Sequence, residues 1–250
     1  MDIGHITQLA KDELGNQAKC AYRQDLTGPS GQDHLKVDEL GAGDFIFVDS
    51  GVAGSEPQHS DDPEGLLLSV RRPVGASGNM GSWAAANVQG VALADTLLLF
   101  AIFARPSQVP VSAQYVQGTY APSLLMNIST TLMGATSQFR PEGVRLNLPG
   151  TGLGLNRPLI ASELQAKLFD PQHPSVFCLV LRIDRAPTAT AGKAWLFVGN
   201  DEADSVAFSL TNLTATTPIL DLRAGIGTAS GVEYRASVYL RDFQIWAPTP

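Results

Sequence analysis

Cysteine, clustered basic residues and long apolar runs are all scarce in this 250-residue chain. Cys20 and Cys178 are too few and too far apart for a disulfide scaffold, so we expect free thiols, with a single disulfide as the alternative. The 17 Lys and Arg residues are scattered against 24 Asp and Glu, and the net charge is −7. This balance argues against a nucleic-acid partner, because such binding draws its affinity from clustered basic side chains on phosphates.

The apolar runs are also too short for a membrane protein of the helical kind. The longest, LLLFAIFA at 97–104, falls far below the roughly 20 residues of a spanning helix, so it predicts a buried strand and no membrane span. The start, MDIGHITQLAKDELG, lacks the basic and apolar regions of a secretory signal, so we expect a protein made in the cytoplasm without export. The four histidines are isolated and lack the short spacings of a zinc site.

What the chain does contain is a series of short apolar runs separated by turn residues, supplied by 24 Gly and 16 Pro. The runs are strand-length and rich in β-branched and aromatic residues, which predicts a sandwich or barrel. We expect one all-β domain over residues 41–250, a two-sheet antiparallel sandwich. The predicted strands lie at 44–52, 65–73, 82–93, 96–106, 123–130, 143–150, 175–184, 193–200, 204–213, 218–227 and 235–246.

Residues 1–40 differ from the rest and predict a short helical arm followed by a linker. Ile3, Ile6, Ala10 and Leu14 fall near helical spacing behind Asp2, a candidate N-cap. The polar stretch YRQDLTGPSGQDH predicts a loop. The arm could pack on its own domain or on a neighbouring chain, and the sequence leaves both open. A second short helix is predicted at 161–170.

The last predicted strand, RASVYLRDFQIW at 235–246, changes phase. Apolar side chains alternate through Leu240 and then resume at Phe243 and Ile245, which predicts a β-bulge at Arg241 and Asp242. The alternative is a strand buried on both faces, in which phase carries no meaning.

The segment LRDFQIW at 240–246 resembles the closing strand of concanavalin A-like, laminin-G-like jelly rolls. Other segments of the chain also occur in the order expected for that group, over roughly residues 41–247. They are the central strand TLLLFAIFARP, the hairpin FCLVLRID with KAWLFVGN, and the strand LDLRAGIG. At the hairpin turn, Gly199 and Asn200 stand in the reverse of the usual order. The resemblance implies a jelly roll with two antiparallel sheets, and it carries no catalytic signature.

The resemblance implies two kinds of site that acidic residues could form. Hydrolases place acids at alternate positions of one strand, and Glu202 with Asp204 is the nearest local match, although solvated acids after a turn are the favoured interpretation. Relatives that bind Ca²⁺ use rim oxygens, and four predicted loop acids could supply some of these ligands: Asp61, Asp62, Asp201 and Asp204. The spacing of these acids is not diagnostic, so we expect no cofactor beyond a candidate Ca²⁺ site.

Aromatic side chains in loops could stack on sugar rings. Trp83, Tyr115 and Tyr120 are predicted in or near loops and are the candidate carbohydrate-binding residues, with pinning of the loops to the sandwich as the alternative.

These observations favour a non-enzymatic attachment or assembly protein. By analogy of fold, we expect a particle-associated protein, such as a head-decoration, fibre or tail component of a bacteriophage virion. Its expected partners are other protein subunits, in a homo-oligomer, and a surface glycan. The alternatives are a stand-alone carbohydrate-binding lectin and a glycan hydrolase.

Overall fold

The computed structural model describes most of the chain. The described residues are 1–27, 36–38, 40, 46–50, 56–62, 64–72, 80–104, 119–128, 131–140, 143–151, 157–170, 172–173, 175–211, 213–229 and 234–249.

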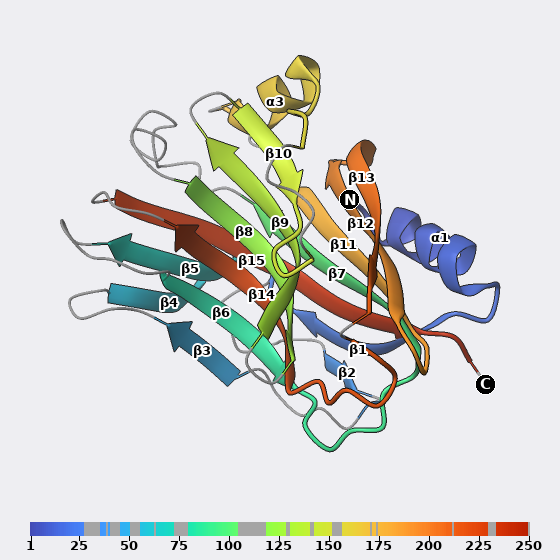
Figure 1. Cartoon of the computed structure of the whole chain (residues 1–250). Coiled ribbons are helices and arrows are strands. Elements are labelled where there is room, and N and C mark those ends of the chain that lie inside the picture. Colours follow the sequence, from blue (N-terminus) through green and yellow to red (C-terminus); the bar gives the residue numbers. More distant parts are fainter. Residues whose placement is uncertain are drawn as a thin grey trace.

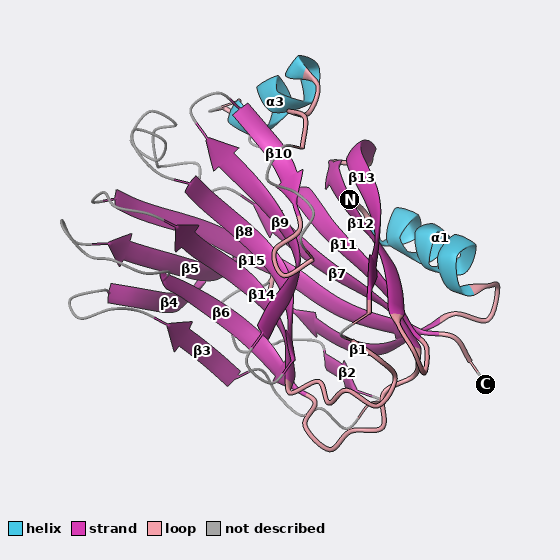
Figure 2. Ribbon diagram, in the orientation of Figure 1, coloured by secondary structure: helices cyan, strands magenta, loops and turns pink. Residues whose placement is uncertain are grey.

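The described strands form a nine-stranded and a six-stranded sheet, and every strand pair is antiparallel (Figures 1 and 2). The larger sheet runs in the order β13 (Asp201–Leu210), β12 (Thr190–Val198), β11 (Phe177–Arg185), β7 (Thr96–Ala104), β15 (Tyr234–Ala247), β1 (Lys19–Asp25) and β2 (Lys36–Asp38), with β5 (Gly65–Arg72) paired to β15 and β4 (Glu56–Asp62) paired to β5. The smaller sheet runs in the order β10 (Gly143–Asn147), β9 (Thr131–Arg140), β8 (Thr119–Ile128), β14 (Asp221–Ala229), β6 (Met80–Asn87) and β3 (Ile46–Ser50). The predicted two-sheet antiparallel sandwich is therefore confirmed.

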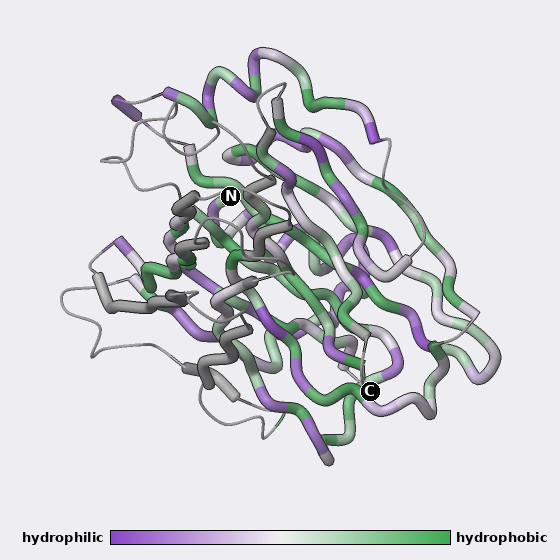
Figure 3. Tube along the Cα trace, turned by 60° about the vertical axis from the view of Figure 1, so that its left-hand side comes forward, coloured by the Kyte–Doolittle hydropathy of each residue, from purple (hydrophilic) through white to green (hydrophobic). Residues whose placement is uncertain are grey.

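The main core lies between the two sheets. It contains inward-facing residues from both, among them Leu99 and Phe103 of β7 and Leu124 and Phe139 of the smaller sheet. Figure 3 shows hydrophobic residues recurring along the strands that supply this core. Side chains alternate across a strand, so each inner face contributes every second residue to the core.

The central strand β7 is buried on both faces, which explains its unbroken apolar sequence. Its odd-numbered residues face the main core, while Leu98, Phe100 and Ile102 belong to a second apolar cluster on the outer face of the nine-stranded sheet. Helix α1 (Ile3–Leu14) covers that cluster with Ile6 and Ala10, both fully buried. The helical arm therefore packs on its own domain (Figure 1).

The predicted features of the two helices are confirmed. Asp2 is the N-cap of α1, and its Oδ1 accepts a hydrogen bond of 2.8 Å from the backbone N–H of His5. Helix α3 (Ser162–Phe169) lies between β10 and β11 and buries Leu168. None of the described helices is long and apolar enough to cross a bilayer. Both cysteines are free.

The predicted boundary at residue 40 needs correction, because β1 and β2 are strands of the nine-stranded sheet. β1 pairs with β15 from Lys19 to Asp25, and Tyr22, which was predicted to begin a polar loop, is fully buried in the main core. Residues 19–25 are thus part of the sandwich and not of a separate arm or linker.

The predicted bulge in β15 is confirmed. The register of β15 against β7 shifts between Leu240 and Asp242, and Leu240, Phe243 and Ile245 all face the main core and are fully buried. At the same point β15 changes partners on its other side, pairing with β5 up to Leu240 and with β1 from Asp242 onward. The bulge therefore lies where three strands meet the closing strand.

Candidate functional site

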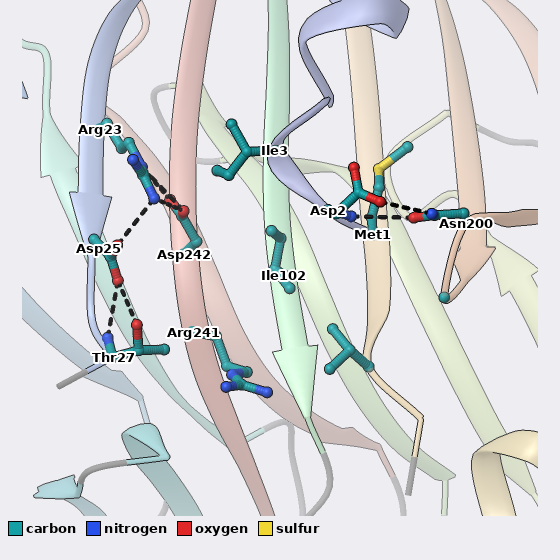
Figure 4. A pocket seen from close by; sticks show the side chains of 12 residues that line it. Met1, Asp2, Ile3, Arg23, Asp25, Thr27, Ile102, Asn200, Arg241 and Asp242 are labelled. Carbon is teal, nitrogen blue, oxygen red and sulfur yellow. Dashed lines mark hydrogen bonds and ion pairs between the residues drawn. The ribbon is translucent and has the colours of Figure 1, made fainter. Parts of the chain in front are cut away.

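A pocket of about 580 Å³ opens on the outer face of the nine-stranded sheet, beside the bulge in β15. The start of α1, strands β1, β7 and β15, and the turn between β12 and β13 all contribute to it (Figure 4). Its lining residues are Met1, Asp2, Ile3, Arg23, Asp25, Thr27, Ile102, Val176, Gly199, Asn200, Arg241 and Asp242.

The bulge directs Asp242 outward, into a network of charged and polar groups. Arg23 of β1 donates to Asp242 Oδ2 through Nε at 3.0 Å and through Nη2 at 2.7 Å. The same Nη2 donates to Asp25 Oδ2 at 2.9 Å. Behind the pair, Gln244 donates to Asp242 Oδ2 at 3.1 Å, and the indole N–H of Trp246 donates to Gln244 at 2.8 Å. This network fixes the rotamer of the buried carboxylate.

The pKa values of the pair reflect burial and mutual attraction. Burial raises the pKa of the Asp242 carboxyl above its usual range, and the hydrogen bond and charge of Arg23 oppose this shift only in part. Burial disfavours the charged form of Arg23 as well, but the hydrogen bond and charge of Asp242 outweigh it and raise the pKa of the guanidinium. Arg23 is therefore charged at every accessible pH.

Two further groups of polar side chains are held in place around the pocket. Thr27 donates to Asp25 Oδ1 from its backbone N–H at 3.0 Å and from its hydroxyl at 2.7 Å. Across the pocket, the backbone N–H of Asp2 donates to Asn200 Oδ1 at 3.1 Å, and Asn200 Nδ2 donates to Asp2 Oδ2 at 2.8 Å. The hydrogen bond from the His5 N–H, followed by that from Asn200, lowers the pKa of the exposed Asp2 carboxyl.

Between these two groups the wall is aliphatic. Ile102 of β7, Val176 and Ile3 of the first turn of α1 contribute it, and Ile3 is unusual in being 49% exposed. The pocket thus combines fixed hydrogen-bonding groups with an apolar strip. Such a surface suits a ligand that carries several hydroxyl groups on a ring with C–H faces.

Trp83 is not among the described residues that line this pocket. Trp83 is in strand β6 and is only 5% exposed, with the Arg223 guanidinium 5.7 Å from its ring centroid. Tyr120 is a residue of strand β8, paired with Thr228 and Phe139. Trp83 thus lies in the strand predicted at 82–93, Tyr120 is the second residue of β8, and Tyr115 lies outside the described residues. The role of these three aromatic residues in carbohydrate binding stays a prediction.

The four acids predicted as metal ligands are not brought together. Asp61 and Asp62 belong to β4, whereas Asp201 and Asp204 belong to β13, at the opposite edge of the nine-stranded sheet. Asp201 forms an ion pair with Lys167 at 2.6 Å, and Asp204 forms one with Arg157. Within the described part of the chain, no group of three or more metal-ligating side chains occurs.

The acids considered for hydrolysis do not occupy matching positions of one strand either. The register of β13 against β12 shifts, so that Glu202 pairs with Phe197 and Asp204 with Leu196. An extra residue therefore separates two adjacent rungs of the ladder, and the alternation expected for Glu202 and Asp204 is interrupted.

Sequence reasoning missed the acids and arginines of the pocket, although one signal pointed to them. The phase slip predicted the bulge that aims Asp242 outward, but no residue near it was assigned a role. Arg23 and Asp25 fell in a stretch predicted to be a loop.

Comparisons with known proteins give similarity of fold alone. No family model matches the chain, and no curated protein does. Among solved structures, lectin II from Ulex europaeus is 12% identical, covers 93% of this chain and 99% of its own, and has a TM-score of 0.46. A GH131 beta-glucanase catalytic domain from Podospora anserina is 10% identical, covers 81% and 84%, and has a TM-score of 0.47. A seed lectin of Lotus tetragonolobus is 9% identical, covers 91% and 98%, and has a TM-score of 0.41. These are proteins of the kind named by the strand-pattern resemblance, and at such scores they assign neither activity nor ligand to this chain.

Proposed function

We propose that this protein is a non-enzymatic carbohydrate-binding module that serves attachment, and that it holds sugar in the pocket at the β15 bulge. The observation that carries the proposal is the pocket itself, with carboxylates and a guanidinium fixed on one side and an aliphatic strip beside them. Fixed donors and acceptors give a sugar its orientation without an ordering cost, and the strip accepts its C–H face.

The pocket favours binding over hydrolysis because its two best-placed acids share one cation. Asp25 and Asp242 both accept hydrogen bonds from Arg23, which keeps them engaged within the protein. A glycan hydrolase is the second candidate, since burial raises the pKa of Asp242 as a general acid requires, with the Asp25 carboxylate nearby.

We propose further that the module acts as part of a larger particle, such as a virion, in several copies. Display of many copies raises the overall affinity for a glycan-coated surface even when each pocket binds weakly. This part of the proposal rests on analogy of fold and is tested separately from sugar binding.

Binding is tested by retention of the purified protein on a glycan array, with two matched variants. Ile3→Ala removes an exposed aliphatic side chain from the pocket wall, whereas Leu159→Ala removes one that is 39% exposed and lies outside the pocket lining. We expect Ile3→Ala to weaken retention about three- to tenfold, the equivalent of roughly 1 kcal/mol of lost apolar contact. Leu159→Ala should bind as the unchanged protein does.

The result that overturns the proposal is retention of no glycan, or equal retention by both variants. Hydrolysis is separated from binding by Asp242→Asn. If the unchanged protein shortens any arrayed glycan and Asp242→Asn still binds that glycan without shortening it, the protein is a hydrolase.

A further inference from the structure

We infer that the pocket selects an acidic sugar, one whose carboxylate pairs with Arg241. This inference rests on the proposed function and specifies the chemical class of its ligand. It follows from an accounting of the charged side chains that line the pocket, which are Asp2, Arg23, Asp25, Arg241 and Asp242.

The three carboxylates of the pocket already have donors within the protein. Asp242 and Asp25 accept from Arg23, and Thr27 adds two hydrogen bonds to Asp25. Asp2 caps helix α1 and accepts from Asn200. None of these carboxylates therefore needs a cation from the ligand.

The two arginines differ. Arg23 is held by two carboxylates, whereas Arg241 has no hydrogen bond or ion pair of its side chain anywhere in the described part of the chain. Its backbone is fixed, since its carbonyl oxygen accepts a hydrogen bond of 2.9 Å from the Leu26 N–H. Figure 4 shows its side chain beside the pocket, clear of the Arg23–Asp242 pair.

The bulge explains why Arg241 lies here without a side-chain partner among the described residues. Because an extra residue is inserted between Leu240 and Asp242, Arg241 is left out of the β7 ladder at the point where β15 changes from β5 to β1. A guanidinium offers a planar fork of donors that matches a carboxylate in two parallel hydrogen bonds. A sugar whose carboxylate meets Arg241 would have its ring within reach of the aliphatic strip and the Asp25–Thr27 group.

The test uses the intact chain and two arrayed probes that differ only in one group, β-linked glucuronic acid and β-linked glucose. The variants are Arg241→Gln, and Lys11→Gln on the exposed side of α1, which makes the same change in net charge away from the pocket. We expect the unchanged protein and Lys11→Gln to prefer the acidic probe. The affinity of Arg241→Gln for the acidic probe should fall about ten- to a hundredfold, while its affinity for the neutral probe should hardly change.

Other outcomes overturn the inference in distinguishable ways. If both probes bind equally, and Ile3→Ala weakens this binding but Arg241→Gln does not, the pocket binds sugar but does not select an acidic one. Binding of neither probe, nor of any other arrayed sugar, would remove the proposed function as well. Arg241→Lys supplies a second variant, which should retain part of the preference because it keeps the charge but not the fork. Thermal unfolding of each variant checks that the loss of binding is not a loss of fold.

Discussion

At the scale of single residues, the Arg23–Asp242 pair determines both the shape and the charge of the pocket. Asp242 is 5% exposed, so its carboxylate depends on Arg23 and Gln244 for the hydrogen bonds that water would otherwise make. Breaking such a pair leaves a buried charge without compensation, which costs more than the pair itself contributes. The pair is therefore a good target for a stability test, and the binding and activity of Asp242→Asn are interpreted only together with its thermal unfolding.

The stability test depends on pH. Because the pKa of Asp242 is raised in the folded protein, the folded state holds this proton more tightly than the unfolded chain does. The favourable contribution of Asp242 is fully present below the usual carboxyl pKa of about 3.9 and is lost as the pH rises through the raised value. We expect the free energy of unfolding of the unchanged protein, relative to Asp242→Asn, to fall across that window and then level off.

Urea unfolding of both proteins between about pH 3 and pH 7 measures this difference. A difference that grows with rising pH would show that the attraction of Arg23 exceeds the effect of burial, and that the pKa of Asp242 is lowered.

Trp83 shows why single residues are hard to place from sequence. Its indole lies against two glycines, since a Cβ built on Gly81 would come within 2.0 Å of the ring and one on Gly225 within 2.7 Å. An aromatic side chain that lies flat on a sheet needs such neighbours, and one of them is on a different strand, β14. The Gly-x-Trp spacing at 81–83 was a local signal of this packing, but Gly225 becomes a neighbour only through strand pairing.

At the scale of elements, helix α1 is held chiefly by apolar contact with the outer face of the nine-stranded sheet. Its fully buried residues, Ile6 and Ala10, belong to the same outer cluster as Leu98, Phe100 and Trp195. Its charged side contributes one ion pair, from Arg182 Nη1 to Glu13 Oε2 at 2.8 Å, and Arg182 also pairs with Asp184. Burial of apolar area outweighs a half-exposed ion pair in such a docking.

Two substitutions in α1 test this ranking. Ile6→Ala leaves a cavity under the helix and should lower the free energy of unfolding by about 2–4 kcal/mol. Glu13→Gln removes the ion pair but leaves Arg182 with Asp184, and it should lower the free energy of unfolding by less than about 1 kcal/mol. Chemical denaturation of both variants measures the two values, and equal losses would contradict the ranking.

The elements that could be predicted have regular patterns of apolar residues. The elements that were missed have interrupted patterns. The run at 97–104 and the helical spacing behind Asp2 gave β7 and α1 directly. Strand β1 was missed because its register shifts between Cys20 and Tyr22, so that Ala21 and Tyr22 are both buried and the alternation disappears. Strand β9 was missed because Gly134 and the buried Ser137 interrupt its apolar residues.

At the scale of the whole molecule, strand β15 joins the parts of the nine-stranded sheet. It pairs with β7 along one side, and with β5 and then β1 along the other. The pocket was beyond sequence reasoning at this scale, because its walls come from Arg23, Ile102 and Asp242, which only the completed sheet places side by side. A bulge is visible in one strand, but what faces it depends on the partners of that strand.

Two truncations test the role of the first residues in the whole fold. Removal of residues 1–40 deletes β1 and its buried Tyr22, so we expect this variant to lose cooperative unfolding. Removal of residues 1–14 keeps β1 and uncovers the outer apolar cluster, so we expect a folded sandwich that binds more apolar dye and self-associates. Circular dichroism measures the unfolding of the two truncated proteins, and light scattering measures their self-association. The native mass of the intact chain, by light scattering, tests the proposed homo-oligomer. A cooperative transition in the 1–40 deletion would show that β1 is dispensable.

The pairing of β1 with β15 also sets how the molecule responds to force. Lys19 lies opposite Ala247, and Asp25 lies opposite Asp242, so β1 begins where β15 ends, whereas Met1 itself lies in the pocket with Asp242. A load that pulls the two chain ends apart therefore acts first on the Asp2–Asn200 hydrogen bonds and on the docking of α1. Once α1 has left the sheet, the load acts along the hydrogen bonds between β1 and β15 and opens their rungs singly, beginning near the contact of Thr249 with Gln17. The Arg23–Asp242 pair joins β1 and β15 at the opposite end of their pairing. If the proposed sugar binds there, it would stabilise the strand pairs that separate last, so bound sugar should raise the force needed to separate β1 from β15.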